Sequence, residues 1–228
     1  MKQGELKGIK FFYRENTSDL KTFEEVIGRN VYRKRGMTIL PGESWYDCGG
    51  NVGAFTILAA SLGAKVTTFE PDPNNCIMIH KNLKLNGLEA EVIQAGLVHN
   101  DQKKANLYVG NNGNVWRNSM FKNWNGKGIK VDCINFDETI PDDICIKIDI
   151  EGAEMPILEN TQRKFKKMVF EWSFDIDGNL NRFRRCIDRL SSDYEIKMID
   201  PRYYNNPDDF VPKNFIVKAT NVYCIRKR

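Results

Sequence analysis

A glycine-rich turn in the first third of the sequence carries residue types that can hold a ligand. Residues 45–56 read W-Y-D-C-G-G-N-V-G-A-F-T, so that a short apolar run ends at Asp47 and an amphipathic apolar segment follows the turn. This pattern is typical of a strand that passes through a tight turn into a helix. Gly49 and Gly53 allow positive φ angles and let a ligand approach the backbone. The spacing is D-x-G-x-N-x-G, with Asn51 where the dinucleotide motif G-x-G-x-x-G has its second glycine.

Two acidic residues predict the kind of ligand that this turn binds. The carboxylate of Asp47, at the mouth of the turn, disfavours a pyrophosphate and favours a cation or an amine. Glu70 ends the next predicted strand, 65–70, and in a βαβ unit that end lies beside the first strand, where a carboxylate can accept both ribose hydroxyls. S-adenosylmethionine (SAM) carries an ammonium, a sulfonium and a ribose, and it therefore fits both positions. An ordinary glycine-rich turn without a ligand is the alternative.

A second group of acidic residues follows two later apolar runs. Asp149 and Glu151 stand at the end of run 144–150, and Glu171 lies within run 168–174. Ligands of open α/β sheets bind at the carboxyl ends of the strands, where a carboxylate can take a proton from a reacting group. We expect Asp149 to be the catalytic base, with its pKa raised by the like charges of Glu151 and Glu171.

Three carboxylates without a histidine allow two other interpretations. Asp149 and Glu151 could cap the helix that follows them. Alternatively, a hard divalent cation such as Mg²⁺ or Mn²⁺ could bind the carboxylate oxygens and activate the acceptor as a Lewis acid. Between the base and the cation we favour the metal-free base. Lys147 shares the strand face of Asp149 but lies deeper along the strand.

Strands and helices are expected to alternate along the chain. The predicted strands are 8–14, 44–47, 65–70, 90–98, 144–150, 168–174, 194–199 and 222–226, and the predicted helices are 18–28, 52–63, 74–86, 155–165 and 180–190, with an antiparallel excursion of 103–109 and 129–134. This alternation predicts a doubly wound, Rossmann-like α/β sheet. We expect a single domain over residues 1–228, in which residues 1–40 form a strand and helix lid over the core, 41–228.

Composition narrows the class of protein. Hydrophobic residues make up 41% of the 228 residues and charged residues 28%, as in soluble globular proteins. No apolar run approaches the roughly 20 residues that cross a bilayer, and the first residues do not lead into the core of a signal peptide. We therefore expect a cytoplasmic protein without membrane insertion. The net charge of +4 is mild, and the arginines of 182–189 are typical of a solvated helix face.

Three stretches together resemble the FkbM family of SAM-dependent methyltransferases. They are Y-D-C-G-G-N-V-G-A-F-T, V-T-T-F-E-P-D-P-N-N with N-L-K-L-N-G behind it, and C-I-K-I-D-I-E-G-A-E-M-P-I-L. The resemblance implies a class I methyltransferase fold of seven strands, the last one antiparallel, and O-methylation, commonly of sugars or other natural-product hydroxyls. It assigns Asp47, Gly49, Asn51 and Gly53 to the SAM loop, Glu70 to the ribose, and Asp149 and Glu151 to the D-x-E-G signature. Related chains often carry E-x-H near the end of the fifth strand, whereas this chain has Glu171-Trp172-Ser173, so no histidine base is expected there.

The expected acceptor is a hydroxyl, most simply on a saccharide. Enzymes that methylate amino groups of nucleic acids typically carry [DN]-P-P-[YFW] after the fourth strand, where this chain has D-I-E-G; nucleic acid is therefore disfavoured as a partner. Five aromatic residues could offer flat faces to sugar rings, namely Trp116, Trp124, Trp172, Tyr203 and Tyr204. Two other functions stay open. One is an NAD-dependent oxidoreductase, which the missing second glycine opposes, and the other is an inactive SAM-binding module of a larger multi-enzyme protein.

Overall fold

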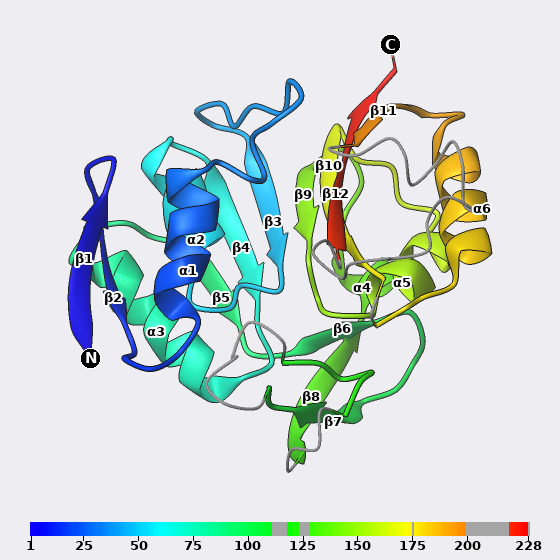
Figure 1. Cartoon of the computed structure of the whole chain (residues 1–228). Helices are drawn as coiled ribbons and strands as arrows, with labels where there is room; N and C mark the ends of the chain where they lie inside the picture. The colour runs from blue at the N-terminus through cyan, green and yellow to red at the C-terminus, as the bar shows by residue number, and fades with distance from the viewer. Residues whose placement is uncertain (111–117, 124–127, 175, 199–218, 228) are drawn as a thin grey trace, which may run out of the picture.

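The computed structural model describes residues 1–110, 118–123, 128–174, 176–198 and 219–227, and a seven-stranded sheet forms its centre (Figure 1). The order of the strands is β11-β12-β10-β9-β3-β4-β5. Their bounds are β3 (Ser44–Cys48), β4 (Lys65–Phe69), β5 (Glu91–Ile93), β9 (Cys145–Ile148), β10 (Lys167–Ser173), β11 (Tyr194–Met198) and β12 (Ala219–Arg226). Strand β3 pairs in parallel with β4 and β9, and β9 pairs in parallel with β10. The final strand, β12, runs antiparallel to both β10 and β11.

Successive residues of the central strands face two different cores, because side chains alternate along a strand. Cys145 and Val169 belong to one core, whereas Ile146 and Phe170 belong to the other. The first core also contains residues of α2 (Ala54–Ser61) and α3 (Pro73–Leu85), and the second contains residues of α5 (Glu154–Asn160) and α6 (Leu180–Leu190). Helices therefore cover both faces of the sheet, which confirms the predicted doubly wound α/β class.

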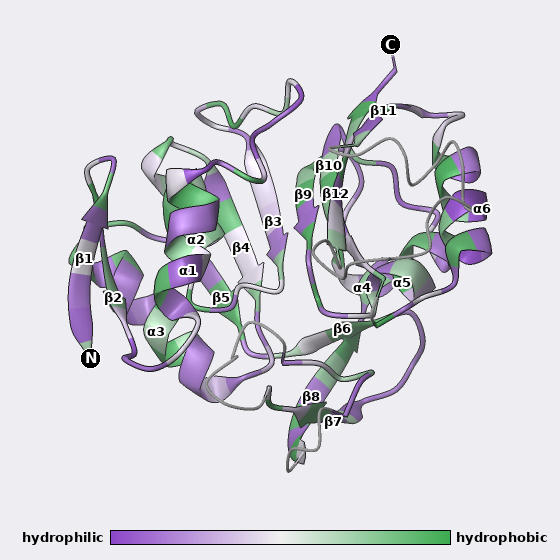
Figure 2. Cartoon of the chain, viewed as in Figure 1, coloured by the Kyte–Doolittle hydropathy of each residue, from purple (hydrophilic) through white to green (hydrophobic). Residues whose placement is uncertain are grey.

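Helix α6 shows how the sequence pattern produces this burial. Its buried residues are Phe183, Cys186, Ile187 and Leu190. They recur at intervals of three and four, so they lie on one face of the helix. Figure 2 shows the hydrophobic and hydrophilic sides of this helix in green and purple. The predicted bounds of α6, 180–190, agree with the structure.

The N-terminal segment packs beside the first core. It contains the antiparallel pair β1 (Lys2–Leu6) and β2 (Ile9–Tyr13), then α1 (Asp19–Phe23) and the π-helical turn η1 (Glu24–Gly28). Asn82 of α3 and Asn86, the C-cap residue of that helix, hold β2. Asn82 Oδ1 accepts the Phe12 N–H at 2.7 Å, and Asn86 Oδ1 accepts the Lys10 N–H at 2.9 Å. The predicted strand and helix of this segment are present. Strand β1 was not predicted, because its residues are mostly exposed.

A three-stranded sheet lies beside the carboxyl ends of the central strands (Figure 1). Its order is β6-β8-β7, with β6 (Gly96–Val98), β7 (Lys104–Tyr108) and β8 (Gly128–Asn135), and the short helix α4 (Phe136–Thr139) follows. The predicted antiparallel pairing of β7 and β8 is confirmed. The single strand predicted over 90–98 is wrong, because the chain divides there into β5 of the central sheet and β6 of the small sheet. No described helix is both long and apolar enough to cross a bilayer.

Candidate active site

The glycine-rich turn joins β3 to α2 and brings two strand ends into close contact. Gly49 has φ 88°, and a Cβ atom on it would lie 1.8 Å from the carbonyl oxygen of Asp149. Only glycine therefore allows the backbone after β3 to lie against the backbone after β9. Gly53 has φ 86° and precedes the first residue of α2, and a Cβ atom there would approach Ile79 to 3.2 Å. Both glycines thus shape the turn through close packing.

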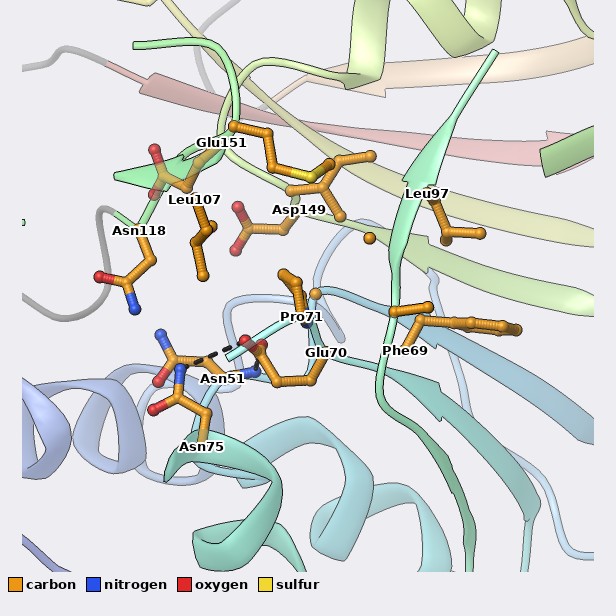
Figure 3. A pocket seen from close by; sticks show the side chains of 15 residues that line it. Asn51, Phe69, Glu70, Pro71, Asn75, Leu97, Leu107, Asn118, Asp149 and Glu151 are labelled. Atoms are coloured by element: carbon orange, nitrogen blue, oxygen red, sulfur yellow. Dashed lines mark hydrogen bonds between the residues drawn. The ribbon is translucent and has the colours of Figure 1, made fainter. Parts of the chain in front are cut away.

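A pocket opens beside this turn. Gly49, Asn51 and Glu70 line one part of it, and Asp149 and Glu151 line another. Figure 3 shows the carboxylates of Glu70 and Asp149 on this pocket, projecting from the ends of β4 and β9, the two neighbours of β3. Apolar residues complete the lining, namely Phe69, Pro71, Ala95, Leu97, Leu107, Met120 and Ile150.

Glu70 stands directly after β4, as predicted, with only 4% of its surface exposed. One carboxylate oxygen accepts the Asn51 N–H at 2.7 Å, and the other accepts the Asp72 N–H at 2.9 Å. Burial raises the pKa of Glu70 to about 7, although these backbone N–H groups oppose the rise. The residue is a hydrogen-bond acceptor that changes its charge near neutral pH.

Three amide side chains gather on the Glu70 side of the pocket (Figure 3). Asn75 donates to Glu70 at 3.4 Å, and Asn118 donates to Asp72 at 3.0 Å. Asn51 Oδ1 is buried and has no hydrogen-bond partner in the described part of the chain. Such an oxygen calls for a donor. SAM fits these groups, because its ribose hydroxyls and ammonium are donors and its adenine suits the apolar lining.

The predicted position of Asp47 at the mouth of the turn is wrong. Asp47 is fully buried, and it pairs with Lys147 at 3.0 Å and accepts the Thr56 hydroxyl proton at 2.7 Å. Lys147 also donates to the carbonyl oxygen of Gly49 at 2.5 Å. Burial lowers the pKa of Lys147, but the charges of Asp47 and Asp149 outweigh it and raise that pKa overall. Because Lys147 binds both Asp47 and the Gly49 carbonyl, this ion pair fixes the backbone of the turn. Asp47 therefore influences the pocket by positioning the turn.

The three carboxylates predicted at the ends of the later strands do come together. Oxygen atoms of Asp149, Glu151 and Glu171 all lie within 4.8 Å of one another, a spacing at which they could hold a cation. Burial and then the charge of Asp149 raise the pKa of Glu171 well above its usual range. Glu151 adopts φ 52°, in the left-handed region that residues other than glycine seldom occupy. The site thus brings three carboxyl groups together beside the pocket.

The N-cap residue of α5 is Ala153, which makes no side-chain cap hydrogen bond, and Glu154 binds the turn before the helix instead. Its carboxylate accepts the N–H groups of Ile150 at 2.6 Å and Gly152 at 2.8 Å, in the turn between β9 and α5. Burial raises the pKa of Glu154 to about 7. Asp149 lines the pocket beside this turn.

The structure adds a tyrosine that sequence reasoning missed. The Tyr32 hydroxyl donates to Asp149 Oδ2 at 2.5 Å. The two residues lie in distant parts of the chain, and no motif surrounds Tyr32, so the sequence offers no signal for the contact. The prediction that Trp172 could offer a flat face to a sugar ring is wrong, because this residue is 1% exposed and stacks on Phe183 with ring centroids 4.2 Å apart. Trp116, Trp124, Tyr203 and Tyr204 lie outside the described residues.

Solved structures with a similar fold are methyltransferases. A dimethyladenosine transferase from Plasmodium falciparum matches at 13% identity with a TM-score of 0.51, covering 91% of this chain and 62% of that one. The tRNA (uracil-54, C5)-methyltransferase of Pyrococcus abyssi, solved with S-adenosyl-L-homocysteine, matches at 13% identity and a TM-score of 0.51, covering 99% of this chain and 44% of that one. A methyltransferase from Pyrococcus furiosus matches at 16% identity and a TM-score of 0.51, covering 97% and 90%. At these identities the likeness shows the fold, and this chain spans less than two thirds of the first two proteins.

Comparison with protein families identifies the family of this chain. No curated protein matches the chain. The model of the methyltransferase FkbM domain matches residues 47–196, a range that holds the glycine-rich turn, Glu70 and all three clustered carboxylates. Methyl transfer is thereby favoured over the hydride transfer of an NAD-dependent oxidoreductase. The chain belongs to the methyltransferase FkbM domain family.

Proposed function

We propose that this protein methylates a hydroxyl group, in the simplest case on a saccharide, and that Asp149 is the general base. The observation that carries the proposal is the position of Asp149. Its carboxylate shares one pocket with Glu70, while Glu151 and Glu171 lie beside it. The methyl donor and the acceptor can therefore meet at the Asp149 side of the pocket.

The chain's own residues divide the work between the two sides of the pocket. Glu70 and Asn51 would hold the ribose and the polar end of SAM. SAM, when bound, supplies an electrophilic methyl group to the acceptor oxygen and leaves as S-adenosylhomocysteine. Asp149 takes the hydroxyl proton, which makes the oxygen a better nucleophile. The turn fixed by Gly49 and Lys147 sets the distance between the two sides, and such alignment accounts for much of the rate of a displacement.

A hydroxyl acceptor suits this cluster better than a nucleobase amine does. Amino-methylating enzymes of nucleic acids typically bind their target through [DN]-P-P-[YFW] after the fourth strand, and here that place holds Asp149 to Gly152. A sugar brings several hydroxyl donors to the carboxylate oxygens of this cluster.

Incubation with labelled SAM and a panel of glycans, nucleic acids and proteins tests the proposal. We expect label in glycans, and we expect Asp149→Asn to reduce turnover by about 10²- to 10⁴-fold, the usual contribution of a general base. Asp132→Asn is the matched control, since Asp132 is an exposed β8 residue paired with Lys104. Label found only in nucleic acid or in protein nitrogen would overturn the acceptor class. SAM binding without any turnover would identify an inactive module.

Chelation separates the base from a cation held by the same carboxylates. We expect turnover to survive exhaustive treatment with EDTA. Activity that disappears on chelation and returns with Mg²⁺ or Mn²⁺ would instead assign Asp149, Glu151 and Glu171 to a metal ion that activates the hydroxyl.

A further inference from the structure

Tyr32 joins the N-terminal segment to the carboxylate that we propose as the base. Its hydroxyl donates to Asp149 Oδ2 at 2.5 Å, and the side chain is almost fully buried, with 6% exposed. Burial and the charge of Asp149 raise the pKa of Tyr32 well above its usual value, so the hydroxyl keeps its proton and remains a donor. Because Oδ2 is occupied in this way, Oδ1 is the oxygen that would take the proton of the acceptor.

Packing holds the Tyr32 ring from several elements. The ring lies edge-on to Phe55 of α2, with centroids 5.7 Å apart, and the Lys147 ammonium is 5.5 Å from its centre. The N–H of the preceding residue, Val31, donates to the carbonyl oxygen of Glu25. The carbonyl oxygen of Val31 accepts a hydrogen bond from the hydroxyl of Tyr223 in β12. The tyrosine therefore has one well-defined position and can impose it on Asp149.

The same segment also reaches the Glu70 side of the pocket. Arg14 forms an ion pair with the fully buried Asp19 at 2.8 Å and donates to Asn75 Oδ1 at 2.8 Å. Asn75 in turn donates to Glu70. Residues before position 47, where the family match begins, thus contact groups on both sides of the pocket.

We infer that Tyr32 is a positioning residue that orients the Asp149 carboxylate, and that the N-terminal segment is a built-in part of the methyl-transfer site. This inference rests on the proposed role of Asp149 as the base. Without the hydroxyl of Tyr32, the carboxylate is free to rotate away from the acceptor. A displacement of about 1 Å at a reacting group typically reduces the rate about 100-fold.

A double-mutant cycle of Tyr32→Phe and Asp149→Ala tests the contact without any acceptor, because alanine removes both carboxylate oxygens. Stability is measured by urea unfolding of the wild type, each single variant and the double variant. We expect Tyr32→Phe to lower the urea midpoint in the wild type and to have at most half that effect in Asp149→Ala, as for residues that interact directly. Tyr194→Phe is the matched control, because it removes a buried hydroxyl that accepts the Phe165 N–H far from the site. Its effect should be equal in both backgrounds, and an equal effect of Tyr32→Phe in both would overturn the inference.

Turnover then tests positioning, with whichever acceptor of the panel takes up label. Tyr32→Phe should reduce kcat by about 10- to 100-fold, leave the KM for SAM within about twofold, and have no further effect in Asp149→Asn. A kcat equal to that of Tyr194→Phe would overturn the inference. Full turnover by Asp149→Asn would overturn the proposed base and this positioning role together. Label in a non-saccharide acceptor would overturn only the proposed substrate class.

Discussion

At the scale of single residues, the site depends on carboxyl groups whose environments differ sharply. Glu70 is buried and receives two backbone N–H groups, whereas Asp149 faces the pocket and receives one phenol. The pKa of Glu70 is raised to about 7 by burial. A carboxylate accepts stronger hydrogen bonds than a carboxylic acid, so we expect the proposed binding of a ribose by Glu70 to depend on pH.

SAM affinity should accordingly rise with pH and level off above about 7. Below that pH, Glu70 must lose a proton before it can accept both ribose hydroxyls, and binding is coupled to proton release. Glu70→Ala should weaken SAM binding by roughly 10- to 100-fold at pH 8 and flatten the pH profile. Calorimetric titration between pH 6 and 8 measures both effects. Glu91→Gln, at an exposed position of the neighbouring strand β5, should retain the wild-type profile. A pH-dependent affinity in Glu70→Ala would show that another group is responsible.

Residue types and spacing predicted most of the pocket but misplaced one carboxylate. Glu70, Asn51, Asp149 and Glu151 line the pocket, because each follows a strand whose end was recognisable. Asp47 also lies at a strand end, but its side chain points to the core side and meets Lys147. Lys147 was expected to share a strand face with Asp149. Its pairing with Asp47 could not be predicted, because it depends on the register of β3 and β9. Tyr32 could not be found, since tertiary packing alone brings it to Asp149.

At the scale of elements, the turn after β3 positions the site because it brings two strand ends into contact. The predicted central elements agree closely with the structure, since their apolar periodicity is strong. The failure at β5 and β6 has a physical reason. Residues 90–98 form one continuous strand-like pattern, but the chain leaves the central sheet after Ile93, and β6 pairs with β8 instead. Periodicity alone does not tell which partner a strand chooses.

Alanine substitutions at two glycines with similar backbone conformations test the role of this turn. Gly49 and Gly42 have φ angles of 88° and 80°, but a Cβ atom would overlap the Asp149 carbonyl at Gly49 and meet nothing within 4 Å at Gly42. Gly42→Ala should therefore destabilise the protein only through its backbone conformation, by about 1 kcal/mol. Gly49→Ala should add an overpacking penalty of about 1–3 kcal/mol and weaken SAM binding. Urea unfolding and calorimetry compare the two variants, and equal losses of stability would show that the turn tolerates separation from β9.

At the scale of the whole molecule, the two faces of the sheet serve different purposes. Lys147, Asp149 and Glu171 follow the alternation of Cys145 and Val169, and they therefore point to the face covered by α2, α3 and the N-terminal segment. The other face is closed by α5 and α6 over an apolar core. These ionisable groups thus lie on one side of the sheet, whereas the apolar lining of the pocket includes Phe69 and Leu97 of the other core.

This arrangement predicts that the site reduces the stability of the fold as pH rises. Glu70 is protonated in both the folded and the unfolded state below about pH 4.5, and it then carries no penalty. Between pH 4.5 and 7 the unfolded state ionises while the folded state holds its proton, so the free energy of unfolding falls as pH rises. Above 7 both states are ionised and the full penalty applies, roughly 3 kcal/mol for a pKa raised from 4.5 to about 7.

Urea unfolding of the wild type and Glu70→Gln at pH 5 and pH 8 measures this penalty. The stability of the wild type relative to Glu70→Gln should fall by roughly 2–3 kcal/mol between the two pH values, because glutamine does not ionise. Glu91→Gln, at an exposed position, should show no such change. SAM at 100 times its dissociation constant should restore about 2.7 kcal/mol to the wild type at pH 8. A stability difference independent of pH would mean that Glu70 stays ionised in the folded protein, and the donors from Asn51 and Asp72 would then outweigh its burial.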